Sequence, residues 1–162
     1  MHRSQYYETL KKLERETRAE YGLPSARVLR SDLRRIYRDQ GIKIHLWDYK
    51  LRKLRGAYFN DDLGPTVMLY KALPEDPMVF TMAHELKHHL VDTELSLSYC
   101  DPSNQSEAVE IGAEVFAAEL IYPEAAFADD LQAEGISGGR CTPEAIVRLN
   151  ATLELPSAMP VW

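Results

Sequence analysis

The pattern His84-Glu85-Leu86-Lys87-His88 constrains this chain most, because it links one helix to one kind of chemistry. Two histidines four positions apart lie about one turn apart on the same face of a helix. Both imidazoles can then reach a single metal ion, and the glutamate beside them can take a proton from water at that metal. The pattern therefore predicts a zinc hydrolase site with His84 and His88 as ligands and Glu85 as general base.

The residues around this pattern favour a helix that is apolar on one side. Five apolar residues share that side of a helical wheel: Val79, Met82, Ala83, Leu86 and Leu90. His84 and His88 lie on the other side, with Thr81 beside them. Asp76 is the expected N-cap and Pro77 the first helical residue. Such a helix buries its apolar side and presents both histidines to a cleft.

A zinc hydrolase site uses three protein ligands and keeps one position open, so a third ligand must come from elsewhere. The sequence predicts a helix over 104–122, on which Glu107, Glu110 and Glu114 share one face. One of them is expected as the ligand, and the others as acceptors that fix the histidine tautomers. The residues alone leave open which glutamate binds the metal. A glutamate stripe is also typical of a solvated helix face, and an H-E-x-x-H pattern can arise by chance.

Hydrophobic spacing and turn residues predict the other elements. Helices are expected over 4–20, 25–40 and 123–134 and from 142, and strands over 42–46, 56–59 and 66–70. Gly41 is expected to stop the second helix, residues 60–65 to form a turn, and 95–103 a polar loop. We therefore expect one α+β domain over 1–162. Its parts are N-terminal helices (1–40), a sheet with the histidine and glutamate helices (41–123), and C-terminal helices with an irregular tail (124–162).

Composition is that of an ordinary globular domain, with 45% hydrophobic and 27% charged residues among 162. The chain shows no apolar run of membrane-spanning length and no apolar secretory signal at its N-terminus, so a cytoplasmic location away from membranes is expected. Cys100 and Cys141 lack the spacing of a metal or redox motif and are interpreted as reduced structural thiols.

Charge is distributed unevenly along the chain. Most of the 19 Lys and Arg residues precede Gly56, whereas most of the 25 Asp and Glu residues follow it. Arg27, Arg30, Arg34 and Arg38 fit the solvated side of one amphipathic helix. No aromatic-interleaved nucleic-acid motif accompanies them, so direct nucleic-acid binding is not expected.

Two segments resemble the ImmA/IrrE metallopeptidases, a gluzincin-like family. Residues 80–90, Phe-Thr-Met-Ala-His-Glu-Leu-Lys-His-His-Leu, resemble its F-T-x-A-H-E-L-x-H segment. Residues 110–123, Glu-Ile-Gly-Ala-Glu-Val-Phe-Ala-Ala-Glu-Leu-Ile-Tyr-Pro, resemble its E-x-x-A-N-x-F-A-A-E-L-L-M-P. Residues 54–58 are similar to the strand before its active helix. The resemblance covers about 42–123, and two motifs at the right separation are more specific than one.

The resemblance implies roles for individual residues. It identifies Glu110 as the third ligand and leaves Glu107 as the fallback. Glu114 takes the place usually held by Asn or Asp, where a residue that hydrogen-bonds a metal ligand is implied. Two residues depart from the family pattern. Lys87 replaces a frequent glycine and is expected to alter substrate access near the cleft, and Tyr122 replaces a methionine and is expected in the core.

The resemblance also implies fold and function. It implies a minimal gluzincin-like metallopeptidase fold, α+β, with helices around a small three-stranded sheet. The implied activity is that of a cytoplasmic, zinc-dependent metalloendopeptidase that cleaves a helix-turn-helix repressor, as in stress responses and transcription regulation. Mn²⁺ or iron also suits a site of two histidines and a glutamate. The alternatives are a regulatory binding module that keeps the fold without cleaving, and a metal-independent structural domain.

The remaining histidines and tyrosines carry weaker expectations. His89 points about 100° away from His88 and is interpreted as a surface or hydrogen-bonded histidine. His2 and His45 are expected in solvent. An oxyanion-stabilising donor cannot be assigned from the residues, and three tyrosines remain candidates for it: Tyr58, Tyr70 and Tyr99.

Overall fold

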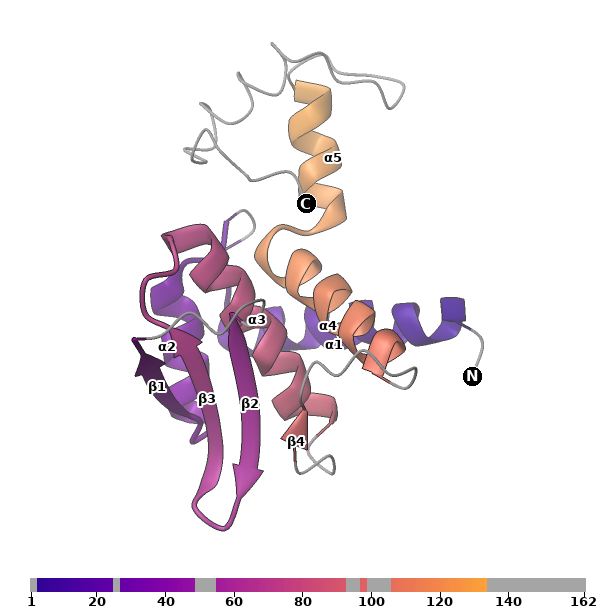
Figure 1. Cartoon of the computed structure of the whole chain (residues 1–162). Coiled ribbons are helices and arrows are strands. Elements are labelled where there is room, and N and C mark those ends of the chain that lie inside the picture. The colour runs from indigo at the N-terminus through magenta and orange to yellow at the C-terminus, as the bar shows by residue number, and fades with distance from the viewer. Residues whose placement is uncertain (1–2, 25–26, 49–54, 93–96, 99–105, 134–162) are drawn as a thin grey trace.

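The computed structural model describes residues 3–24, 27–48, 55–92, 97–98 and 106–133 (Figure 1). Its elements are, in order, α1 (Arg3–Tyr21), α2 (Arg30–Asp39), β1 (Lys43–Trp47), β2 (Gly56–Asp61), β3 (Gly64–Tyr70), α3 (Glu75–Val91), β4 (Leu97–Ser98), α4 (Ser106–Ile121) and α5 (Glu124–Ala133). This order confirms the predicted α+β fold, with helices around a small sheet. Several predictions of the sequence analysis fall outside the described residues: the roles of His2, Tyr99, Cys100 and Cys141, the N-terminal cap of the glutamate helix, and the helix from 142 with its tail.

The sheet has the strand order β1-β3-β2-β4. β1 runs parallel to β3, from the pair Lys43↔Thr66 to Trp47↔Tyr70, and β2 is antiparallel to β3. The three main strands lie where the sequence predicted them. The described sheet nevertheless has a fourth strand, because Leu97–Ser98 pairs with β2 inside the segment that we expected to be a polar loop. Two residues are too few to show an alternating pattern, so this strand left no signal in the sequence.

The predicted turn over 60–65 is too long. β2 continues to Asp61 and β3 begins at Gly64, so that only Asp62 and Leu63 form the turn. The Asp61 carboxylate accepts a hydrogen bond from the Leu63 amide at 2.8 Å and closes the hairpin. Polar residues favour turns, but here the register of the two strands extends the pairing through them.

Two helix starts also differ from the prediction. α2 was expected to begin at residue 25 but begins at Arg30. At this start the Asp32 carboxylate accepts a hydrogen bond from the Leu29 amide at 2.9 Å. α3 begins at Glu75 after Pro74, so Asp76 lies in the first turn and is not the N-cap. An ion pair with Arg27 holds Asp76 there, and its negative charge suits the helix N-terminus.

The end of α2 and its basic residues agree with the prediction in part. Gly41 has φ +69°, a conformation that glycine adopts readily, and it ends the helix as predicted. Arg34 and Arg38 are exposed, as expected. Arg27 and Arg30 instead form ion pairs with Asp76 and Glu75 at the start of α3, so they are not simply solvated.

The core lies between the sheet, α2, α3 and α4. Its buried residues include Leu33, Ile36, Tyr37, Val67, Leu69, Val79, Met82, Ala83, Leu86, Phe116, Ala117 and Leu120. Four of the five apolar positions predicted for α3 are buried, and Leu90 is partly buried against the same cluster. Inside this core the Tyr37 hydroxyl donates to the Met82 carbonyl at 2.7 Å, which ties α2 to the middle of α3.

α4 packs against α3 on one side and α1 on another (Figure 1). Lys11 of α1 forms ion pairs with Glu119 at 3.5 Å and Glu124 at 2.7 Å, and the Arg18 guanidinium donates to the Leu120 carbonyl. These contacts hold α4 and the start of α5 against α1. Within the described residues, no helix is both long and apolar enough to cross a membrane.

Candidate metal centre

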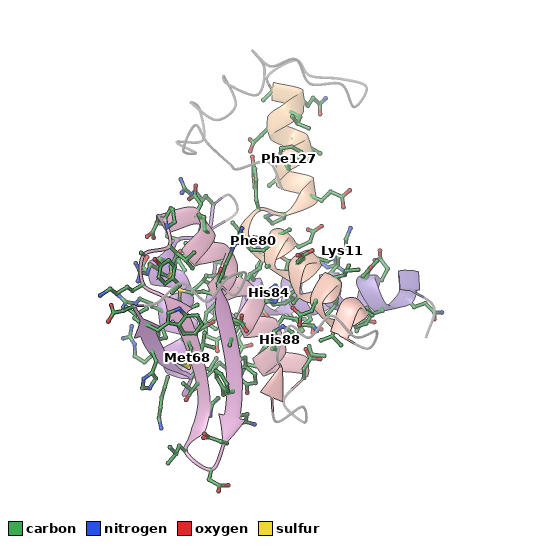
Figure 2. The ribbon with its side chains drawn as sticks, viewed as in Figure 1. Lys11, Met68, Phe80, His84, His88 and Phe127 are labelled. Carbon is green, nitrogen blue, oxygen red and sulfur yellow. The ribbon has the colours of Figure 1, made fainter. Side chains whose placement is uncertain are left out.

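Three expected ligands meet where α3 packs against α4. His84 and His88 lie one turn apart on α3 (Figure 2), and Glu110 reaches them from α4. The two Nε2 atoms are 3.2 Å apart. Glu110 Oε2 lies 3.1 Å from His84 Nε2, and its Oε1 lies 3.6 Å from His88 Nε2. The structure thus brings together two imidazole nitrogens and one carboxylate within 4.8 Å of one another.

These separations fit a tetrahedral metal ion. Ligand bonds of about 2.0–2.1 Å at tetrahedral angles place neighbouring ligand atoms roughly 3.3 Å apart. The measured distances of 3.1, 3.2 and 3.6 Å lie close to that value. Two imidazoles and a carboxylate also form a known donor set of catalytic zinc, and they leave a fourth position open. These three residues can therefore hold a divalent metal ion. Its identity stays open, since manganese and iron accept the same donors.

Asp92, which the sequence analysis missed, orients the second histidine. Asp92 Oδ2 lies 2.8 Å from His88 Nδ1, and the Asp92 amide donates to the His88 carbonyl at 2.9 Å. With the proton on Nδ1, the lone pair of Nε2 is directed at the site. Burial favours a raised pKa for Asp92, but hydrogen bonds from His88 and Lys87 outweigh it and lower that pKa below its ordinary value. Asp92 follows His88 by four residues, and this helical spacing could have predicted the contact from the sequence.

Glu114, another glutamate of the predicted stripe, lies one turn beyond Glu110. Glu114 is exposed on α4. Burial of His84 favours a lower pKa, but the hydrogen bond with Glu110 and the charges of Glu85, Glu110 and Glu114 together raise it. The side chain of Glu107 lies outside the part that the structure describes. A glutamate of this stripe was expected to accept a hydrogen bond from a ligand histidine. For His88 the acceptor is instead Asp92, at the C-terminal end of α3.

Glu85 is buried beside the histidines, with 3% of its surface exposed. Burial raises its pKa to about 7, with the charge of Glu110 acting in the same direction and His84 in the opposite one. Its side chain packs against the backbone of Gly56 in β2. A Cβ atom at residue 56 would lie 2.9 Å from Glu85 Oε1 and 2.5 Å from Thr81 Cγ2. Gly56 therefore leaves the room that the Glu85 carboxyl occupies.

Gly56→Ala is expected to displace Glu85, because the added methyl would overlap Thr81 and the carboxyl. Overpacking of this kind typically costs about 1–3 kcal/mol of stability. We expect a lower melting temperature, measured by thermal unfolding. The double variant Gly56→Ala/Thr81→Ser is the control, because serine removes Cγ2 and keeps the hydroxyl that donates to the Pro77 carbonyl. The double variant should recover stability only in part, because the contact with Glu85 Oε1 remains. Wild-type stability in Gly56→Ala, or a double variant no more stable than Gly56→Ala, would contradict this packing.

Two residues that depart from the family pattern do not lie where we expected them. Lys87 is fully buried and contacts α4, so the expectation that it alters substrate access near the cleft is wrong. Tyr122 is only half-buried, and its hydroxyl donates to Asp130. It therefore lies between α4 and α5 and not in the core. Burial and Asp130 together raise the pKa of Tyr122.

The other histidines agree with the interpretation. His89 is half-buried, and its Nδ1 lies 3.1 Å from the Tyr58 hydroxyl, so it is a hydrogen-bonded histidine as expected. Burial lowers the pKa of His89. His45 is exposed, also as expected. Of the tyrosines considered as oxyanion donors, Tyr58 is buried and already engaged by His89, and Tyr70 is half-buried.

The fold and the site together define a class: an α+β domain of the metallopeptidase type, with an H-E-x-x-H helix packed on a glutamate-bearing helix. The family model Peptidase_M78, described as the IrrE N-terminal-like domain, matches residues 38–151. The chain therefore belongs to this family, and the resemblance drawn from its two motifs is confirmed. A comparison with curated proteins gave no match. Membership indicates a metallopeptidase-like domain.

Proposed function

We propose that this protein is a zinc-dependent endopeptidase. The observation that carries the proposal is the convergence of His84, His88 and Glu110, with Glu85 buried next to the first of them. The proposal is also supported by the family, whose model covers both helices. A buried carboxyl beside a metal-ligand set has a clear use in hydrolysis, whereas a purely structural domain gains nothing from burying it there.

Each residue of the site has a separate role in the proposed peptide hydrolysis. A divalent metal held by His84, His88 and Glu110 would polarise the scissile carbonyl and lower the pKa of water. Asp92 keeps the His88 ring in one orientation and one tautomer. Glu85 accepts the proton of the attacking water and delivers it to the leaving amine. Gly56 leaves the space in which the Glu85 carboxyl can do so.

For the substrate we propose a regulatory protein in the cytoplasm, specifically a helix-turn-helix repressor. Support for this finer step is the family resemblance alone. The test uses the helix-turn-helix protein encoded nearest to this gene, incubated with the purified protein and Zn²⁺ or Mn²⁺. We expect discrete cleavage products with metal, none after chelation, and their return when metal is added back. A repressor that is bound but stays intact under all these conditions would favour the non-cleaving binding module instead.

A further inference from the structure

Lys87 lies between the two histidines in sequence, yet its side chain leaves the site and enters the interface between α3 and α4. It has 0% of its surface exposed. A buried ammonium is costly unless hydrogen-bond partners surround it. Two are present: Nζ donates to Asp92 Oδ2 at 2.6 Å and to the Val109 carbonyl at 3.1 Å.

Each of these partners is adjacent to a metal ligand. Asp92 Oδ2, which Lys87 contacts, is the same oxygen that accepts from His88 Nδ1. Val109 immediately precedes Glu110 on α4. The Lys87 ammonium therefore connects two parts of the site. One is Asp92, which orients the ligand His88, and the other is the α4 backbone next to the ligand Glu110.

We propose that Lys87 is a positioning residue of the metal centre. It holds the Asp92 carboxylate against His88 and ties the α4 backbone at Val109 to α3. In this way it maintains the spacing between His88 Nε2 and the Glu110 carboxylate. This inference rests on the metal site of the proposed function. Lys87 would support that site without contacting the metal-binding atoms of His84, His88 or Glu110.

The variant that tests this role is Lys87→Met, which keeps most of the side-chain volume and removes the ammonium. We expect the dissociation constant for Zn²⁺ to rise about 10–100-fold, as is typical when a partner of the ligand shell is lost. The visible absorption of the Co²⁺-loaded variant should also differ from that of the wild type, because it reports ligand geometry. Wild-type zinc affinity and an unchanged Co²⁺ spectrum in folded Lys87→Met would overturn the proposal.

The matched control is Lys11→Met, which removes another lysine that contacts α4. Lys11 ties α1 to Glu119 and Glu124, away from the metal ligands. We expect this variant to lose some thermal stability and to keep wild-type zinc affinity. An equal loss of zinc affinity in Lys11→Met would overturn the proposal, because loss of any contact to α4 would then be enough to weaken zinc binding.

A double variant separates positioning from simple charge compensation. Lys87→Met alone leaves the Asp92 carboxylate buried without its ammonium partner and is expected to lower stability. Lys87→Met/Asp92→Asn removes both charges and should regain stability, measured by thermal unfolding, while its zinc affinity stays below that of Asp92→Asn alone, in which Lys87 can still contact the Val109 carbonyl. If its zinc affinity equals that of Asp92→Asn, Lys87 only balances a charge and the proposal fails.

Glu110→Gln, measured in parallel, distinguishes this failure from failure of the metal site. Wild-type protein that binds zinc no more tightly than Glu110→Gln would reject the site itself, and with it both proposals. Tight zinc binding that depends on Glu110 but is the same in Lys87→Met would reject only the role of Lys87.

Discussion

Glu85→Gln is expected to lower the rate of peptide cleavage by about 10²–10⁴-fold, the usual contribution of a general base. Glutamine keeps the shape of the side chain, so it fits the space bordered by Gly56 and Thr81. It has no carboxylate to accept the proton of the attacking water. The measurements are kcat on the proposed repressor substrate and the zinc content per protein molecule. The zinc content should stay at the wild-type value.

The control for this experiment is Glu75→Gln, the same chemical change in the first turn of the same helix. Glu75 is exposed and its contact with Arg30 is a surface ion pair, which contributes little to stability. We expect wild-type activity from this variant. If a zinc-loaded Glu85→Gln protein cleaves at the wild-type rate, Glu85 is not the general base. The proposed mechanism of peptide hydrolysis would then be wrong.

Glu110→Gln is expected to weaken zinc binding by more than the 10–100-fold that is typical for loss of a partner outside the ligand set. The neutral amide is a poorer ligand, and only His84 and His88 would remain. The measurement is zinc affinity by competition with a chromophoric chelator, together with the melting temperature with and without zinc. At zinc concentrations near 100 times the wild-type dissociation constant, the variant should lose about 2.7 kcal/mol of ligand-induced stability.

Glu114→Gln is the matched control for this second prediction, since Glu114 lies one turn further along α4 and is exposed. Removing its charge should leave zinc affinity within about twofold of the wild type, because the charge acts through solvent. The opposite result, with affinity lost in Glu114→Gln and kept in Glu110→Gln, would show that the register taken from the family motif is wrong.

The sequence predicted well where local periodicity carries the information. α3 and its apolar side followed from spacing, as did the three main strands and the stop at Gly41. Local signals failed where a tertiary contact competed with them. Asp76 and Pro77 looked like the N-cap and the first helical residue, but α3 starts two residues earlier than predicted, at Glu75, and Asp76 pairs with Arg27. The hairpin looked like a long turn, but strand register shortened it to two residues.

The sequence by itself determined that His84 and His88 share a helix face with Glu85 beside them, because a spacing of four residues fixes this within any helix. It narrowed the third partner to a stripe of glutamates, and the family motif pointed to Glu110 within it.

Only the tertiary structure decided which groups surround those residues. Asp92 orients His88, Lys87 reaches the backbone of α4, and Gly56 makes room for Glu85. Each of these contacts depends on how α3 packs against α4 or β2. That packing is set by side chains distant in the chain, and no local period encodes it.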